Sequence, residues 1–238
     1  LITIGNKNAS ISILGINRGD NNKIQLQLNC YDKKIIVTTP FIAPFQAINS
    51  LIAGCMATVN TDITIPEAFA AIEKLSDVRG RLECVAKLKD NNIFIDYAHT
   101  PDALLNVLET IVKIKQNENS IITVVGCGGG RDRAKRLKMG SIASRLSQKV
   151  IFTSDNPRDE DPKSIIDDMI AGVDDADKSK VLNIVDREEA IVKASKVAKP
   201  NDILLVAGKG HEKYQIIKSK KIRFNDKEIL TQTLKMAV

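Results

Sequence analysis

The sequence predicts an α/β fold with a doubly wound, mostly parallel sheet in its second part. Short runs of Val, Ile and Leu alternate there with longer segments whose apolar residues recur at helical spacing. Runs that are apolar throughout are typical of parallel strands, because helices cover both faces of such a sheet. The five runs are residues 93–96, 121–126, 150–154, 182–185 and 203–208.

Each segment between these runs is expected to be a helix. In residues 101–116, Leu104, Val107, Leu108 and Ile111 fall on one helical face, which would pack on the sheet. The other predicted helices are residues 134–147, 162–172, 186–198 and, after the last strand, 226–236. This alternation of strand and helix is the pattern that a doubly wound sheet requires.

The first part of the chain has a different pattern. The expected elements are strands at 24–28 and 35–38 and helices around 48–56 and over 66–75. Residues 76–80, Ser-Asp-Val-Arg-Gly, carry a turn signal. We therefore place a domain boundary there, with one domain at 1–78 and a second at 79–238.

Composition excludes several classes of function. Of the 238 residues 43% are apolar and 27% charged, which argues against disorder. No apolar run is long enough to span a bilayer, and no secretory signal is visible. The chain has no Trp and few other aromatic residues for stacking on nucleic-acid bases, although its net charge is +6. Four cysteines without metal-binding spacing indicate reduced thiols, so we expect a cytoplasmic protein that neither enters a membrane nor binds nucleic acid.

The candidate site lies in the loops that follow the strands, because doubly wound sheets bind ligands outside the carboxyl ends of their strands. One such loop has three glycines followed by Arg131, and another is Asp155-Asn-Pro-Arg158. A third contains Gly208-Lys-Gly-His-Glu212. Arginines bind carboxylates and carboxylates bind ammonium groups, so these loops together favour a small zwitterion such as an amino acid.

Other types of site are not supported. The glycine loop has Arg131 where a dinucleotide-binding G-x-G-x-x-G pattern would place its last glycine, and the chain contains no P-loop sequence G-x-x-x-x-G-K-[ST]. His99 and His211 lack metal-ligand spacing, so we expect no metal site in this chain.

Simpler structural explanations remain open for three features. A solvated helix face would also account for Lys135, Arg136 and Lys138. A turn that caps the helix beginning at Pro162 would account for residues 155–158. A loop made flexible by its glycines would account for residues 208–212.

Five segments resemble the Mur ligase family in order and spacing, and within it the branch that adds diaminopimelate. They are Arg-Gly-Arg-Leu-Glu at 79–83, Asp-Tyr-Ala-His-Thr-Pro-Asp-Ala-Leu at 96–104, Gly-Cys-Gly-Gly at 126–129, Asp-Asn-Pro-Arg at 155–158 and Gly-Lys-Gly-His-Glu at 208–212. The resemblance covers the whole chain and is most specific from residue 79. One departure is Leu137, where the family often has Pro.

The resemblance implies that residues 1–78 are the C-terminal part of a central ATP-binding domain. Residues 79–238 would be the C-terminal, Rossmann-like domain that binds the amino acid. The resemblance implies the reaction of the diaminopimelate-adding branch, which joins meso-diaminopimelate to a UDP-N-acetylmuramoyl-dipeptide through an acyl phosphate during peptidoglycan synthesis, using ATP and Mg²⁺. Since the P-loop is absent, we expect a fragment that is inactive alone. We also expect it to be a monomer. The catalytic residues and the Mg²⁺ ligands are expected in the missing upstream half.

The resemblance also assigns site residues. The positions implied for meso-diaminopimelate are Arg131, Asp155, Asn156, Pro157, Arg158, Gly208 and Glu212. Arg81 and Asp96 match positions that contact the phosphate and the ribose of ATP. Arg158 favours diaminopimelate over lysine, because lysine lacks the distal carboxylate. The alternatives are a non-catalytic remnant and another ligase of the Mur or folylpolyglutamate type.

Overall fold

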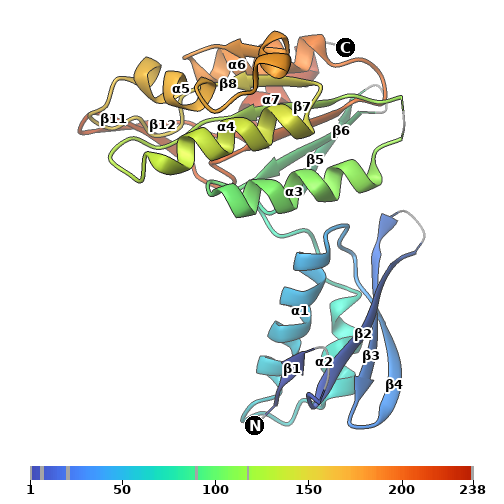
Figure 1. The fold of residues 1–238 in the computed structure, drawn as a ribbon. Helices are drawn as coiled ribbons and strands as arrows, with labels where there is room; N and C mark the ends of the chain where they lie inside the picture. Colours follow the sequence, from blue (N-terminus) through green and yellow to red (C-terminus); the bar gives the residue numbers. More distant parts are fainter. Residues whose placement is uncertain (1, 6–7, 20–21, 89–90, 117, 237–238) are drawn as a thin grey trace. The chain divides into compact units, whose positions relative to one another are not determined.

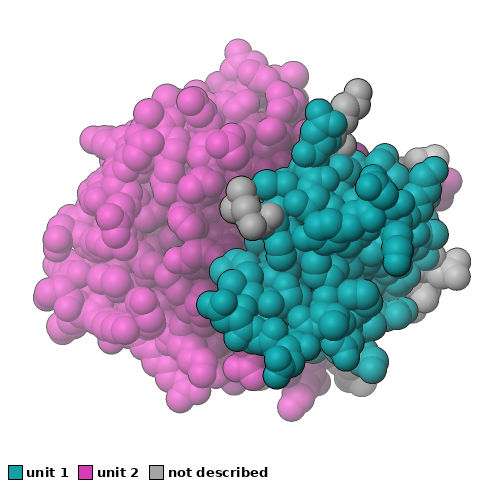
Figure 2. Space-filling view, turned by 90° about the horizontal axis from the view of Figure 1, so that it is seen from below, with its two compact units in different colours: residues 1–77 teal, residues 78–238 magenta. Residues whose placement is uncertain are grey.

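The structure, a computed structural model, describes residues 2–5, 8–19, 22–88, 91–116 and 118–236. The chain divides into two compact units, unit 1 (Leu1–Asp77) and unit 2 (Val78–Val238), which Figure 2 shows in different colours. Each unit has its own hydrophobic core. The division falls within the predicted turn segment.

Unit 1 combines an antiparallel sheet with two helices. Its strands lie in the order β1 (Ile4–Gly5), β2 (Ile11–Arg18), β3 (Ile24–Cys30) and β4 (Lys33–Thr38), with β1 parallel to β2. Helices α1 (Pro44–Ala57) and α2 (Ile65–Ile72) share a core with the sheet through Leu28, Leu51 and Phe69. The expected strands and helices are confirmed. Strand β2 was not predicted, because Gly15 and an irregular register interrupt its alternation.

The sheet of unit 2 has six strands in the order β5-β6-β10-β7-β8-β9. They are β5 (Glu83–Leu88), β6 (Asn91–Asp96), β7 (Ile121–Val125), β8 (Lys149–Phe152), β9 (Val181–Asn183) and β10 (Ile203–Ala207). All five predicted strands are present and parallel, and β5 pairs with β6 as an antiparallel edge that the sequence did not predict. Every residue of β7 and β10 is buried, as their apolar sequences require. The predicted mostly parallel sheet is confirmed.

Helices cover both faces of this sheet, so the fold is doubly wound as predicted (Figure 1). The helices are α3 (Pro101–Ile114), α4 (Ala134–Leu146), α5 (Pro162–Ile170), α6 (Arg187–Val197) and α7 (Asp226–Met236), with a short 3-10 helix at Asp175–Lys180. Their sequences explain their starts: Thr100, Asp161 and Asp186 each accept a hydrogen bond from a backbone N–H of the first turn. None of the described helices is long and apolar enough to cross a membrane.

A β-hairpin, β11 (Tyr214–Ile217) and β12 (Lys220–Arg223), follows the last strand and was not predicted. It contacts the loop after β8: the backbone N–H of Arg158 donates to the Ile216 carbonyl at 3.0 Å, and that of Lys218 donates to the Arg158 carbonyl at 2.7 Å. The hairpin therefore fixes one of the loops expected to form the site.

Candidate functional site

A pocket of about 450 Å³ lies at the carboxyl ends of the parallel strands, where the sheet rule places a ligand. Loops after β6, β7, β8 and β10 form it. The lining residues are Tyr97, His99, Thr100, Gly128, Arg131, Asp132, Lys135, Asp155, Asn156, Arg158, Gly208 and Glu212. Six of the seven positions implied for meso-diaminopimelate are among them, whereas Pro157 lines a neighbouring cavity of about 610 Å³.

The glycine loop owes its glycines to close packing against the loop after β8. A Cβ atom on Gly129 would overlap the Pro157 carbonyl oxygen, and one on Gly126 would overlap the Thr153 carbonyl oxygen. The Gly129 N–H donates to the Asn156 carbonyl at 2.9 Å. Any side chain at these glycines would push the two loops apart, so the glycines bring Arg131 and Arg158 to one pocket.

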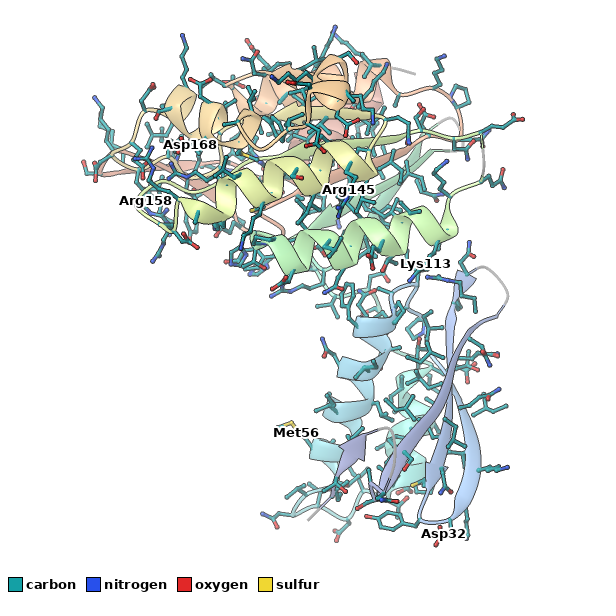
Figure 3. The ribbon with its side chains drawn as sticks, viewed as in Figure 1. Asp32, Met56, Lys113, Arg145, Arg158 and Asp168 are labelled. Atoms are coloured by element: carbon teal, nitrogen blue, oxygen red, sulfur yellow. The ribbon has the colours of Figure 1, made fainter. Side chains whose placement is uncertain are left out.

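Arg158 is held in an uncommon conformation with its guanidinium at the pocket (labelled in Figure 3). Its φ of +53° lies in the left-handed region, and the hairpin contacts to β11 fix it there. Its Nη1 donates to the Gly129 carbonyl at 2.7 Å. Among the described residues its Nε and Nη2 have no hydrogen-bond partner. This edge of the guanidinium is available for a carboxylate.

Arg131 follows Gly130, whose φ is +62°, and its side chain is exposed. Within the part of the chain that the structure describes, no carboxylate pairs with Arg131 or with Arg158. Both arginines line the pocket. Lys135 also lines the pocket, with its Nζ bonded to the His99 carbonyl at 2.8 Å, so the pocket presents three cationic side chains that no described carboxylate neutralises.

Glu212 lies near these arginines, but its cationic partner is Lys209, a residue that sequence reasoning missed. Lys209 is completely buried, and its Nζ lies 3.0 Å from Glu212 Oε2. Glu212 also accepts from Asn156 Nδ2 at 3.1 Å. Burial acts to raise the pKa of Glu212, but the hydrogen bonds from Lys209 and Asn156 outweigh it and leave the pKa below its ordinary value. Lys209 and Asn156, and not the two pocket arginines, are thus the groups that keep this carboxylate ionised.

His211 does not share the position of its neighbour. It is exposed, its ring centroid lies 5.5 Å from that of Tyr97, and it does not line the pocket. The two side chains are separated by a turn and not by strand alternation: β10 ends at Ala207, Gly210 has a φ of +53°, and the Glu212 N–H donates to the Lys209 carbonyl at 3.0 Å. Only Glu212 of the two faces the arginines' pocket.

Of the simpler explanations, a solvated helix face fails for Arg136 but not for Lys138, and a cap of the helix at Pro162 fails altogether. Arg136 is fully buried rather than part of a solvated face, with Nη1 2.9 Å from both Glu160 Oε2 and Asp168 Oδ2. Lys138 is exposed, as that explanation requires.

The cap of α5 is Asp161, which accepts from the Lys163 and Ser164 N–H groups, so residues 155–158 do not cap this helix. Arg136 also bonds the Gly128 carbonyl at 3.4 Å and thereby braces the glycine loop.

Arg81 and Asp96, the residues expected at ATP, do not line the pocket. Arg81 is exposed, with its guanidinium 4.9 Å from the centroid of the Tyr97 ring. Asp96 is 3% exposed, and its two oxygens accept from the Leu82 and Ala98 N–H groups at 2.6 and 2.7 Å. Burial raises its pKa despite these bonds. Asp96 thus holds the backbone at Leu82 and at Ala98. A ribose hydroxyl that bonded to Asp96 would share these oxygens with the two N–H groups.

No cluster of three or more His, Cys, Asp or Glu side chains in the described ranges could hold a metal ion. Mg²⁺ commonly takes only one or two protein carboxylates and completes its coordination with waters and substrate phosphates, so this observation concerns sites made of protein ligands alone.

Unit 2 is thus a doubly wound domain whose pocket, at the carboxyl ends of its strands, is lined by arginines and carboxylates. Residues 80–210 match the family described as Mur ligase, glutamate ligase domain. This is more than half of the chain, and the chain belongs to the Mur ligase family.

The chain is similar to ligases of one kind within that family. It is 46% identical over 198 residues to the UDP-N-acetylmuramoyl-L-alanyl-D-glutamate–2,6-diaminopimelate ligase of Bacteroides fragilis, covering 83% of this chain and 41% of that protein. It is 41% identical over 238 residues to the ligase of the same name from Rickettsia montanensis, covering 99% of this chain and 47% of that protein. The chain thus spans somewhat less than half the length of these relatives.

Solved structures of Mur ligases are similar to this chain in fold. A structure of UDP-N-acetylmuramoyl-L-alanyl-D-glutamate–2,6-diaminopimelate ligase aligns over 97% of this chain and 46% of its own, with a TM-score of 0.65 and 32% identity. The MurF ligase of Thermotoga maritima, crystallised with ADP, aligns over 100% of this chain and 49% of its own, with a TM-score of 0.67. At 15% identity the latter shows a shared fold alone.

Proposed function

We propose that this chain is the amino-acid-binding part of an ATP-dependent ligase that joins meso-diaminopimelate to UDP-N-acetylmuramoyl-L-alanyl-D-glutamate in peptidoglycan synthesis. Residues 79–238 carry the amino-acid site, and residues 1–78 are the end of the ATP-binding domain. The observation that carries the proposal is the convergence of Arg131, Arg158 and Glu212 in one pocket. The relatives named above bear the same activity in their names.

The pocket can hold both charged groups at the distal end of diaminopimelate. The unpartnered edge of Arg158 and the exposed guanidinium of Arg131 would bind the carboxylate. Glu212 and the Gly208 carbonyl would receive the ammonium group. Asp155 and Asn156 complete the wall, and Pro157, which lies outside the pocket lining, would act by holding the turn between Asn156 and Arg158. Lysine has no distal carboxylate, so Arg158 would distinguish the two amino acids.

Binding one end of the ligand in this way leaves the amine at its other end as the nucleophile. That amine attacks the activated D-glutamate carboxyl carbon, a C–N bond forms, phosphate leaves and the amine loses a proton. When bound, ATP supplies the phosphoryl group that activates the carboxylate. In this chain Arg81 would contact a phosphate and Asp96 the ribose. The contribution of the pocket is orientation, which converts an encounter of two solutes into a reaction between fixed groups.

A cytoplasmic, monomeric enzyme that uses ATP and Mg²⁺ follows from the same proposal. Its support is the resemblance of the five motifs to the family and the ADP complex of a protein with the same fold. The absence of a P-loop sequence leads us to expect that the 238-residue chain alone neither hydrolyses ATP nor forms the amide.

A chimera tests the proposal. The 238 residues would replace the corresponding part of the Bacteroides fragilis relative, and phosphate release would be measured with UDP-N-acetylmuramoyl-L-alanyl-D-glutamate present. We expect release that depends on meso-diaminopimelate in the chimera and none from the chain alone. A folded chimera that prefers L-lysine or D-glutamate would overturn the proposed substrate.

A further inference from the structure

Lys209 is a fully buried ammonium group beneath the pocket. It directly follows Gly208 at the end of β10, and none of its side chain is exposed. Its Nζ donates to Asp155 Oδ1 at 3.3 Å, Asn156 Oδ1 at 3.0 Å and Glu212 Oε2 at 3.0 Å. An ammonium group has three N–H donors, so each of them has an acceptor.

These bonds determine how the pocket side chains are turned. Asn156 Oδ1 accepts from Lys209 and from the Ile216 N–H at 2.9 Å, which directs its Nδ2 to Glu212. Glu212 Oε2 therefore receives both Lys209 and Asn156. Among the described residues nothing bonds to Glu212 Oε1. Oε2 of Glu212 is fixed by Lys209 and Asn156, and Oε1 remains available to a ligand.

Lys209 offsets part of the charge around this carboxylate. Asp155 and Glu212 carry two formal negative charges and Lys209 one positive charge, so the three side chains keep a net negative charge that attracts an ammonium group, while Lys209 reduces the repulsion between the carboxylates. Groups that face Glu212 from other elements are Tyr97, after β6, and the buried Arg187, at the start of α6; His211 adjoins it in its own loop. Lys209 is the one among these that contacts both carboxylates.

We propose that Lys209 is the positioning residue of the pocket: its ammonium group orients Glu212 and Asn156 for an amino-acid ammonium without touching the ligand. This rests on the proposed function in that the ligand is an amino acid. A purely space-filling role would require only the length of the side chain, whereas this role requires its charge.

Lys209→Met keeps the length and removes the charge. We expect meso-diaminopimelate to bind the 238-residue variant about 5- to 150-fold more weakly, because buried acceptors lose their donor. Lowering the pH should weaken binding by both proteins, and in the variant this loss of affinity should begin at a higher pH than in the wild type. The reason is that Glu212, with a pKa held low by Lys209, would become protonated sooner. Lys193→Met, an exposed lysine on α6, is the matched control and should change neither property.

Calorimetric titrations of meso-diaminopimelate and L-lysine over a range of pH test this. Weaker binding by folded Lys209→Met with an unchanged pH profile would overturn the proposal, because loss of packing alone predicts that result. Unchanged affinity would also overturn it.

A measurement on the wild-type chain covers the case in which the variant does not fold. The side-chain carboxyl ¹³C signal of Glu212 is followed by NMR during a pH titration without ligand. A midpoint below the ordinary glutamate value of about 4.3 supports the pairing with Lys209, and one at or above it overturns the proposal. If the wild type binds neither amino acid, the proposed function fails, and the midpoint then decides separately whether Lys209 pairs with Glu212.

Discussion

Two pairs of arginines in unit 2 differ in what surrounds them. Arg136 and Arg187 are fully buried, and both contact carboxylates: Arg187 bonds Asp226 through Nε and Nη2, each at 2.8 Å. Arg131 and Arg158 line the pocket and contact no carboxylate among the described residues. The buried pair is neutralised by the fold, while the pocket pair keeps its charge for a ligand.

The difference shows that a side chain's availability depends on its partners and not on its type. Burying a guanidinium is costly unless a carboxylate pairs with it, so Arg136 and Arg187 must stabilise the fold through their partners. The pocket arginines remain near solvent, where an unpaired charge costs little. We therefore expect mutations of the two pairs to affect different properties.

The largest expected effect is on stability. Arg187→Met leaves Asp226 buried without its partner, and we expect the free energy of unfolding to fall by about 3–5 kcal/mol. Arg131→Met is the matched control, with a change within about 0.5 kcal/mol, because it removes an exposed side chain. Urea unfolding, followed through amide NMR signals of the six-stranded sheet, measures both. Equal losses in the two variants would abolish the distinction between the pairs.

A large effect on binding is expected at Arg158. Arg158→Met should weaken meso-diaminopimelate binding by on the order of 2–5 kcal/mol if the ligand carboxylate is desolvated, and L-lysine binding far less. In a complete enzyme the same change should raise the diaminopimelate requirement much more than the ATP requirement. Calorimetry and steady-state kinetics measure these quantities. Equal effects on both substrates would make Arg158 a structural turn residue.

A smaller effect on binding is expected at Glu212. Glu212→Gln keeps the size but removes the charge that receives the ligand ammonium, so binding should weaken by about 1.5–3 kcal/mol. His211→Ala is the comparison, because His211 is exposed and lies outside the pocket lining. If His211→Ala weakens binding as much as Glu212→Gln does, the assignment of Glu212 is lost.

The smallest expected effect concerns acid stability. Hydrogen bonds from Arg136 and then from the Gly130 N–H lower the pKa of Glu160 from 4.5 to about 2. A lowered pKa in the folded state contributes stability above pH 4.5, and this contribution is lost as the pH falls toward 2. Glu160 is partly exposed, so the contribution is about 1 kcal/mol or less.

Urea midpoints measured on either side of this pH range test the acid prediction. Glu160→Gln should lose less stability than the wild type on acidification, whereas Glu109→Gln, an exposed residue of α3, should behave as the wild type does. Identical acid profiles for all three proteins would show that Glu160 is not the titrating group.

The sequence predicted the parallel strands and their loops because apolar runs and glycines are local signals. It missed β5 and the hairpin β11–β12, whose short, mixed sequences lack such a period. The burial of Arg136 and Lys209 was also missed, since their carboxylate partners lie 24 or more residues away for Arg136 and include Asp155, 54 residues away, for Lys209. A lysine one residue beyond a fully buried apolar strand, after Gly208, is the signal that could have indicated Lys209.

The most direct test of the central claim is an NMR titration of the ¹⁵N-labelled chain with meso-diaminopimelate. The account predicts that the amide signals of Gly128, Arg131, Asn156, Gly208 and Glu212 shift together with one dissociation constant. Signals of Asn183 and Asp186, which line the neighbouring cavity, should not shift with them. Shifts confined to that cavity, or none at the pocket, would contradict it.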